Sequence, residues 1–380
     1  MRWEAFLQEL AQCLHEVEPT AGSGVPYVGI SNRRTHHDWI HDPEMMPVVT
    51  ALVWIRLEKL SKLGPVELAK LSPEDCVRQG LVDPVRVFVK GEPHKRAKLR
   101  DKRYRLIMSV SLVDQLVARM LFRSQNRKEL ALFRAIPSQP GMGLSTDEQV
   151  QDFVARLGHK VRLPVDEVCN RWREFILPTD CSGFDWSVQE WMLQDDMEVR
   201  NRLTKDCPDI LKRMRASWLH CLANSVLMLS DGVLLAQETA GIQKSGSYNT
   251  SSSNSRIRFL CALYAGASWA LTMGDDALED CQADLSVYKR LGLKVEPSET
   301  LEFCSHRFES PRRALPTGVG KMLFKLLHSY DPASADLECL LRYDAAMYGV
   351  LQELRHLDAA AREGLCLFLA IPEEQKRAGR

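Results

Sequence analysis

The chain has 380 residues, enough for one large enzyme built from subdomains or for more than one domain. Hydrophobic residues make up 45% and charged residues 26%, the ordinary mix of a soluble protein that buries a sizeable core. Lysines and arginines total 50, as do the acidic residues, which excludes a global electrostatic argument for nucleic-acid binding and leaves only local charge patterns.

The cysteine pattern and the apolar stretches narrow the class further. The chain has 11 cysteines but no CxxC pair, which argues against a disulfide scaffold or a structural zinc site and favours reduced thiols in a cytosolic compartment. The longest uncharged stretch, 259–274, is shorter than the roughly 20 residues that a membrane-spanning helix needs. The first residues have no signal-peptide core. We therefore expect no transmembrane segment.

Hydrophobic periodicity and turn residues predict that helices and strands alternate along the chain. Apolar residues at helical spacing predict helices over 44–71, 111–135, from about 146, after 186 to about 205, 211–229, about 248–265, and over most of the chain after about 310. Short alternating or apolar runs predict strands at 84–89, 175–180, in a hairpin at 232–235, and in a strand–turn–strand unit at 268–277. This order predicts an α+β protein with antiparallel strand pairs.

Two groups of carboxylates follow predicted strands. Asp180 and Asp185 frame the segment Asp-Cys-Ser-Gly-Phe-Asp, while Asp275 and Asp276 follow Gly274 in a predicted turn. Each group alone is an ordinary turn sequence. Brought together, such carboxylates suit Mg²⁺, and two ions about 3.5–4 Å apart can stabilise both the attacking and the leaving oxygen in a phosphoryl displacement.

A polar loop at 241–246 leads into a predicted helix. Taken alone, the loop is a turn followed by a helix N-cap. Thr250 and Asn254, however, lie one helical turn apart on the same face. A loop containing Ser245 and Gly246 beside such a face can follow a sugar-phosphate chain and a ribose.

The most basic segment is 86–105, which holds nine Lys or Arg residues against two acids. Most charge runs are only solvated faces. Here Arg105 is followed directly by Leu106 and Ile107, which fixes a basic residue to an apolar segment. Because a guanidinium group can pair bidentately with phosphate oxygens, this segment is a candidate site for a triphosphate.

The order of these segments resembles motifs F, A, B and C of positive-strand RNA virus polymerases. The segments 180–188 (DCSGFDWSV) and 303–306 (FCSH) are most similar to those of the sobemovirus and polerovirus branch, and the likeness covers about residues 86–308. The resemblance implies an α+β right-hand fold with fingers, a palm built on an antiparallel sheet, and a helical thumb. It divides the chain into fingers (1–172), palm (173–205), a fingers insertion (206–240), palm (241–309) and thumb (310–380).

The resemblance also implies roles for individual residues. Asp180 and Asp275 would hold two metal ions with help from Asp276, and Asp185 and Asn254 would recognise the ribose 2′-hydroxyl. The other implied nucleotide contacts are Lys90, Arg105, Ser245 and the supporting Thr250, and the implied RNA contacts are Lys95, Lys98, Arg103, Gly141, Gly143 and Gly246. The lysine that protonates pyrophosphate in related enzymes has no clear equivalent here, since its position falls near Thr300, with Lys294 and Lys289 as the nearest basic residues.

The implied activity is RNA-directed RNA synthesis that replicates a viral genome within a replication complex in the host cytoplasm. The implied cofactor is Mg²⁺, or Mn²⁺, and the implied partners are template and product RNA, ribonucleoside triphosphates and other viral replication proteins. Initiation is open between a de novo start and a protein primer (VPg), which the related plant viruses favour.

Two alternatives remain open from the sequence. A reverse transcriptase shares the palm and its acids, but a site built to bond a 2′-hydroxyl can reject the analogue lacking it by ~10⁴-fold, so Asp185 and Asn254 favour ribonucleotides. A non-catalytic RNA-binding replication protein would use the basic segment alone. This alternative leaves the presence of the two acidic groups unexplained.

Overall fold

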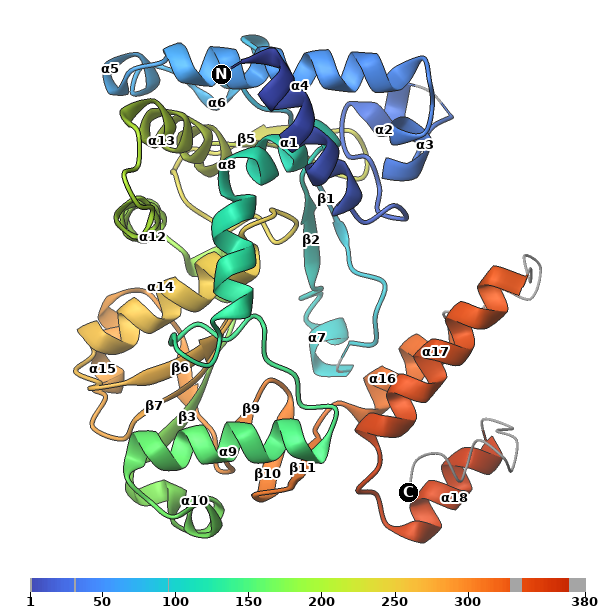
Figure 1. The fold of residues 1–380 in the computed structure, drawn as a ribbon, viewed down its shortest axis with the longest axis vertical. Coiled ribbons are helices and arrows are strands. Elements are labelled where there is room, and N and C mark those ends of the chain that lie inside the picture. The colour runs from blue at the N-terminus through green and yellow to red at the C-terminus, as the bar shows by residue number, and fades with distance from the viewer. Residues whose placement is uncertain (1, 31, 95, 329–336, 369–380) are drawn as a thin grey trace.

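The computed structural model describes residues 2–30, 32–94, 96–328 and 337–368. Helices and strands alternate, and all three sheets contain antiparallel pairs, as the sequence predicts. We call the three regions fingers, palm and thumb; in Figure 1 the fingers are at the top, the palm at the lower left and the thumb at the lower right.

The fingers are built on a sheet in the order β2-β1-β4-β5. Its strands are β1 (Val85–Val89), β2 (Leu106–Ser109), β4 (Val226–Met228) and β5 (Leu234–Ala236). Strand β1 alternates between buried and less buried residues, and it pairs antiparallel with β2 and parallel with β4. The surrounding helices are α1 (Trp3–His15), α2 (Tyr27–Ile30), α3 (His36–Ile40), α4 (Met45–Lys62), α5 (Pro65–Leu68), α6 (Pro73–Arg78), α7 (Arg96–Arg100), α8 (Leu112–Ala131) and α13 (Asp209–Ala223).

The palm is built on a second sheet in the order β6-β7-β3-β8. Its strands are β3 (Ile176–Cys181), β6 (Ala270–Met273), β7 (Asp276–Asp280) and β8 (Val295–Pro297), and all three neighbouring pairs are antiparallel. The palm helices are α9 (Asp147–Val161), α10 (Val165–Arg171), α11 (Phe184–Ser187), α12 (Glu190–Leu203), α14 (Thr250–Tyr264) and α15 (Leu285–Arg290), with a short 3₁₀ turn at Trp172–Glu174.

The thumb follows a small third sheet. This sheet is formed by β9 (Glu302–Phe303), β10 (His306–Ser310) and β11 (Arg313–Pro316). The thumb helices are α16 (Val319–Leu327), α17 (Leu337–Glu353) and α18 (Ala359–Phe368). In Figure 1 the ribbon formed by β1, β2 and α7 extends from the fingers toward α16, so fingers and thumb approach each other beside the palm.

Two large apolar cores hold these regions together. The first joins α1, α4, α8 and α13 to α12 and α14, and so connects fingers and palm. The second packs α9 and α10 against palm strands, with Phe153 between Phe303 and Phe308 and close to Leu278 of β7. Residues 144–172 therefore share a core with the palm sheet, whereas the sequence-based boundary placed them in the fingers.

Some predicted elements differ from the structure in type. The predicted helix over 211–229 ends at Ala223, and Val226–Met228 forms strand β4 instead. This segment pairs with β1, which is distant in sequence, so tertiary pairing overrides the helical periodicity. The small third sheet was not predicted either, because its strands are two to five residues long.

Candidate active site

The acidic residues of the two predicted groups meet at one edge of the palm sheet. Strand β3 pairs with β7 in a register that places Thr179 opposite Ala277. The next position along this register puts Asp180 beside Asp276, and the turn between β6 and β7 carries Asp275. Neighbouring strands lie about 4.8 Å apart, so the three carboxylates share one small region.

The pKa values record this proximity. Removal of water raises the pKa of Asp275, and the negative charges of Asp180 and Asp185 raise it further. Partial burial, followed by the charges of Asp275 and Asp180, raises the pKa of Asp276 to about 7. Three neighbouring carboxylates repel one another, and a multivalent cation bound between them would stabilise their negative charges.

These carboxylates suit a hard cation that takes its other ligands from water and the substrate. Within the described ranges, no group of three or more His, Cys, Asp or Glu side chains is placed so that it could hold a metal ion by itself, and no ion pair engages Asp180, Asp275 or Asp276. Mg²⁺ is usually bound by one or two carboxylates together with water and substrate phosphates. An open set of aspartates without cationic partners therefore fits such an ion.

A hydrogen-bonded pair lies next to these acids. Asn254 Nδ2, on α14, donates to Asp185 Oδ1, on α11, over 2.7 Å. Burial raises the pKa of Asp185, while the bond from Asn254 and the charge of Arg105 lower it. The Asn254 Oδ1 atom is buried and, among the described residues, has no hydrogen-bond partner. It is an acceptor available to a hydroxyl group.

The loop before α14 is attached to the fingers sheet. Gly246 N donates to Met108 O over 2.9 Å, and Met108 N donates to Ser245 Oγ over 3.0 Å. Thr250 Oγ1 bonds the loop carbonyls of Lys244 and Ser247, both at 2.8 Å. These bonds hold the loop against β2 and α14 through Ser245, Gly246 and Thr250. The backbone N–H of Gln243 also donates to the backbone carbonyl of Asp185 over 2.9 Å, so the loop lies next to the residue that carries this acid.

Gly246 is needed for this close approach. A Cβ atom built on Gly246 would lie 2.5 Å from Met108 O, a backbone atom that cannot move aside cheaply. We expect Gly246→Ala to lower the free energy of unfolding by about 1–3 kcal/mol in urea denaturation, the usual range for overpacking. Gly349→Ala is the control, since nothing lies within 4 Å of that position on α17, and it should be neutral or stabilising. Equal stability of Gly246→Ala and the wild type would contradict the close approach.

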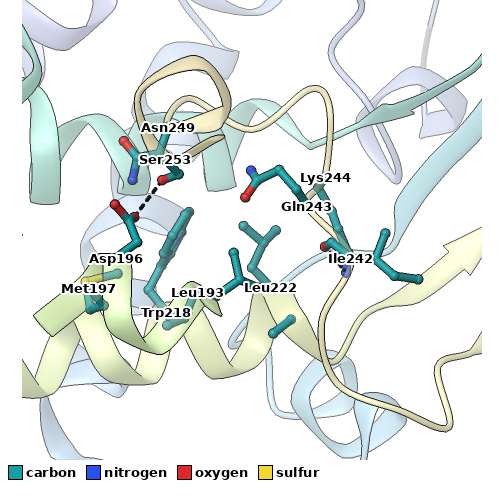
Figure 2. A pocket seen from close by; sticks show the side chains of 12 residues that line it. Leu193, Asp196, Met197, Trp218, Leu222, Ile242, Gln243, Lys244, Asn249 and Ser253 are labelled. Atoms are coloured by element: carbon teal, nitrogen blue, oxygen red, sulfur yellow. Dashed lines mark hydrogen bonds between the residues drawn. The ribbon is translucent and has the colours of Figure 1, made fainter. Parts of the chain in front are cut away.

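The same loop contains a buried lysine. Lys244 is 1% exposed, and its ammonium group donates to Gln237 Oε1 (2.6 Å), Gly241 O (2.8 Å) and Ile242 O (3.1 Å). Burial lowers the pKa of Lys244 to about 7. Figure 2 shows Lys244 beside a small cavity that separates the loop from Leu193 of α12 and Trp218 of α13.

The predicted triphosphate contacts are paired with a glutamate that the sequence did not single out. Glu92 lies 3.2 Å from Lys90, 3.4 Å from Arg105 and 3.0 Å from Lys321 of thumb helix α16. Burial alone would raise the pKa of Glu92, but Lys321 and Lys90 outweigh it and lower that pKa to about 2. The charge of Arg105 lowers the pKa values of Asp185 and Asp275, so Arg105 lies in the neighbourhood of the acids.

Two of the remaining predicted RNA contacts, Lys98 and Arg103, belong to the ribbon formed by β1, β2 and α7. Lys98 is exposed on α7, and Arg103 pairs with Asp101 just after that helix. Lys95 lies outside the described residues. Helix α7, which carries Lys98, lies at the tip of the ribbon formed by β1, β2 and α7 and faces α16 in Figure 1.

The loop that carries the predicted RNA contacts Gly141 and Gly143 lies beside the palm sheet. Gln139 N donates to Thr272 O over 2.9 Å and Thr272 N donates to Pro137 O over 3.0 Å, so the loop is attached to β6. A Cβ on Gly141 would lie 2.2 Å from Leu130 O, and one on Gly143 would lie 2.8 Å from Gln149. Gly141 is therefore needed for close packing against a backbone atom, whereas the neighbour of Gly143 is the end of a flexible side chain.

The two lysines considered as proton donors occupy different positions. Lys294 O accepts from Ser182 N over 3.0 Å, so Lys294 lies next to the segment that carries Asp180. Lys289 is on α15.

Behind the sheet, a buried cluster that sequence reasoning missed joins Arg258 of α14 to Thr179 of β3 and Glu279 of β7. Its hydrogen bonds connect the helix and the two strands that carry the site.

The chain is similar to proteins of known viruses. A family model described as "Viral RNA-directed RNA-polymerase" matches residues 1–315. "Protein P2-P3" of Poinsettia latent virus is 55% identical over 94% of this chain and 32% of its own length. "Protein P1-P2" of Turnip yellows virus is 54% identical over 98% of this chain and 36% of its length, and "Replicase polyprotein P2AB" of Cocksfoot mottle virus is 40% identical over 88% and 35%.

A solved structure, "Sicinivirus 3Dpol RNA dependent RNA polymerase", covers 100% of this chain and 82% of its own, with a TM-score of 0.64 and 11% identity. This likeness concerns the fold alone and confirms the right-hand α+β prediction. The chain belongs to the viral RNA-directed RNA polymerase family. Its relatives confirm the predicted sobemovirus and polerovirus branch, and the chain spans about a third of the length of those it matches. Among the described residues, no helix has the length and apolar character needed to cross a bilayer.

Proposed function

We propose that the chain catalyses template-directed synthesis of RNA from ribonucleoside triphosphates and thereby replicates a viral RNA genome. The observation that supports this most is the strand register that aligns Asp180 with Asp276 beside the turn bearing Asp275. Asp180 and Asp275 would hold two divalent cations, Mg²⁺ or Mn²⁺, with Asp276 assisting. Such ions supply charge stabilisation for the attacking and leaving oxygens.

In the proposed reaction the 3′-hydroxyl of a primer or growing product attacks the α-phosphate of the incoming nucleotide, and pyrophosphate leaves. The residues of this chain mainly bind and orient the reactants, because phosphoryl transfer depends on positioning and charge stabilisation. The Asn254 Oδ1 acceptor and Asp185 would bond the ribose 2′-hydroxyl. Lys90 and Arg105 would exchange their contact with Glu92 for the triphosphate.

The proposal includes several partners. These are template and product RNA, ribonucleoside triphosphates, a protein primer (VPg) and other viral replication proteins. The setting that we propose is a replication complex in the host cytoplasm.

Cation binding should depend on pH through Asp276. Because the pKa of Asp276 is about 7 without a cation, a proton must leave before this carboxylate can help to bind one. We expect the affinity for Mn²⁺, measured by calorimetry, to rise about tenfold from pH 6 to pH 8, as for a single coupled proton. Asp276→Asn should bind more weakly with a flat pH profile; an unchanged pH dependence in this variant would exclude Asp276 as the titrating group.

The experiment that tests the function is primer extension on a defined RNA template with Mg²⁺ or Mn²⁺. Ribo- and deoxyribonucleotides are offered in parallel, and extension is followed with and without EDTA. We expect ribonucleotide incorporation that EDTA abolishes. Equal efficiency with deoxyribonucleotides would favour a reverse transcriptase, and RNA binding without any incorporation would favour a non-catalytic RNA-binding protein.

A further inference from the structure

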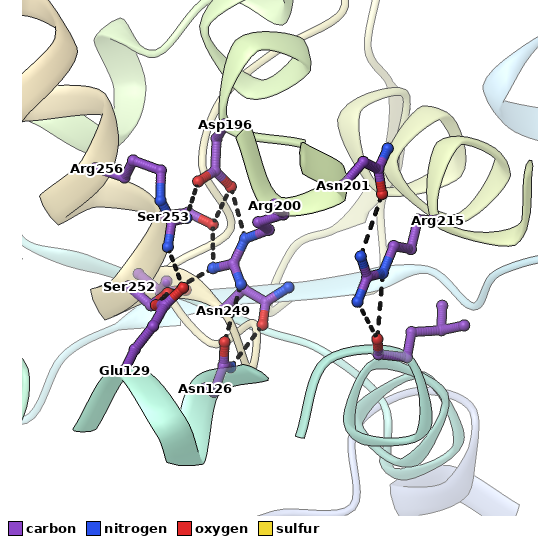
Figure 3. Close-up of polar contacts among 12 residues, drawn as sticks. Asn126, Glu129, Asp196, Arg200, Asn201, Arg215, Asn249, Ser252, Ser253 and Arg256 are labelled. Atoms are coloured by element: carbon purple, nitrogen blue, oxygen red, sulfur yellow. Dashed lines mark hydrogen bonds and ion pairs between the residues drawn. The ribbon is translucent and has the colours of Figure 1, made fainter. Parts of the chain in front are cut away.

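A buried ionic network joins the helix that carries Asn254 to two other helices (Figure 3). It contains two acids and two arginines, so its charges balance, and all its members are at most 8% exposed. They come from the C-terminal part of α8, from α12, and from the start of α14: Asn126, Glu129, Asp196, Arg200, Asn249, Ser252, Ser253 and Arg256.

Arg256 connects the two acids of this network. Its two terminal nitrogens bond Glu129 of α8 and Asp196 of α12, so one guanidinium group on α14 bridges both neighbouring helices. Arg256 and Arg200 together hold the pKa of Asp196 low although its burial alone would raise it. A planar guanidinium group has a fixed fork of donors, so this bridge fixes direction as well as distance.

Arg200 fixes the two serines that directly precede Asn254. Ser253 Oγ donates to Asp196 Oδ2 (2.7 Å) and accepts from Arg200 (3.3 Å). Ser252 Oγ donates to Glu129 Oε2 (2.9 Å) and also accepts from Arg200. Each of the two hydroxyl groups both donates and accepts a hydrogen bond. These bonds together fix the rotation of the start of α14 about its own axis.

That setting determines where Asn254 points. Asn254 follows Ser253, and successive helical residues are about 100° apart, so the network and Asn254 lie on different faces of α14. From the opposite face, the Asn254 side chain donates its hydrogen bond of 2.7 Å to Asp185. Asp185 lies on α11, shortly before α12, so the network connects both members of the pair to one rigid unit.

We propose that Arg256 and Arg200 are positioning residues for ribose selection, which they exert by holding the start of α14 against α12 and α8. This inference rests on the proposed polymerase function. It predicts that loosening the network alters discrimination at the sugar, in addition to any loss of stability.

The test compares kcat/KM for a ribonucleotide with that for the matching 2′-deoxynucleotide during primer extension. Arg256→Lys keeps the charge but cannot bridge Glu129 and Asp196 with one planar group. We expect its ribose preference to fall at least tenfold, with a higher KM for the ribonucleotide and a smaller change in kcat. Incorporation of a 3′-deoxynucleotide relative to the ribonucleotide should stay the same, since the 2′-hydroxyl is present in both.

Arg215→Lys is the matched control. Arg215 is 3% exposed and lies in the same region, over the ring of Phe122 that Arg200 also covers. Its hydrogen bonds go to Leu121 of α8 and to Asn201 and Thr204 at the end of α12, so none of these partners belongs to α14. We expect this variant to lose stability while its ribose preference changes less than twofold.

A milder pair of variants covers the case in which Arg256→Lys does not fold. Ser253→Ala removes one hydroxyl and no charge, and should lower the ribose preference, whereas Ser253→Thr keeps the hydroxyl and should restore it. Ser253 lines the small cavity in Figure 2. An unchanged preference in Ser253→Ala, or equal changes in Arg256→Lys and Arg215→Lys, would overturn the inference. A wild type that extends no primer would instead refute the proposed function.

Discussion

Asp275→Asn should reduce RNA synthesis at least 10³-fold while the protein stays folded, because one amide replaces a charge at the point where two strand ends meet. The substitution preserves size and shape. It lowers the negative charge beside Asp180 and Asp276, and these neighbouring charges are among the causes that raise the pKa values at this site. The melting temperature of the cation-free variant should therefore equal or exceed that of the wild type.

The combination of lost activity and unchanged or higher stability separates a functional acid from a structural one. Primer extension gives the first quantity, and thermal unfolding without divalent ions gives the second. Asp280→Asn is the matched control, because Asp280 lies at the far end of β7, the strand that Asp275 directly precedes, and its carboxylate accepts a hydrogen bond from Ser268. This control should retain activity within about threefold. Asp275→Asn protein with appreciable activity would remove Asp275 from the proposed cation site.

Local patterns in the sequence were sufficient to predict the strands that carry the acids. Strands β3 and β6 are short and mostly apolar, and Gly274 marks the turn between β6 and β7, so the type of these elements depends on nearby residues. The position of α14 also followed from its loop and helical spacing, with a start two residues later than expected. In each case neighbouring residues decide the structure.

Partners that are distant in sequence could not be predicted. Strand β4 was assigned to a helix because its apolar residues continue the periodicity of α13, and only pairing with β1 makes it a strand. The contact of Glu92 with Lys321 joins residues from the fingers and the thumb. Likewise, Arg256 and Glu129 are ordinary helical charges in the sequence, and only tertiary packing makes them a buried pair.

Asn254→Ala should lower the preference for ribonucleotides over deoxyribonucleotides by about 100-fold. A site that bonds a substrate hydroxyl can reject the analogue lacking it by ~10⁴-fold, because its buried polar groups are then left unpaired. In this chain the buried Asn254 Oδ1 atom is such a group, since no described residue donates to it. Alanine removes the acceptor, so the absence of the 2′-hydroxyl is no longer penalised there.

The measurement is the ratio of kcat/KM values for matched ribo- and deoxyribonucleotides on one template. The loss should arise mainly from slower ribonucleotide use, because a hydrogen bond to this substrate is removed while the cation site remains. Asn224→Ala is the control of the same residue type, since the Asn224 amide donates to His220 O at the end of α13. An unchanged ratio in Asn254→Ala would exclude the Asn254 amide from sugar recognition and leave Asp185 to account for it alone.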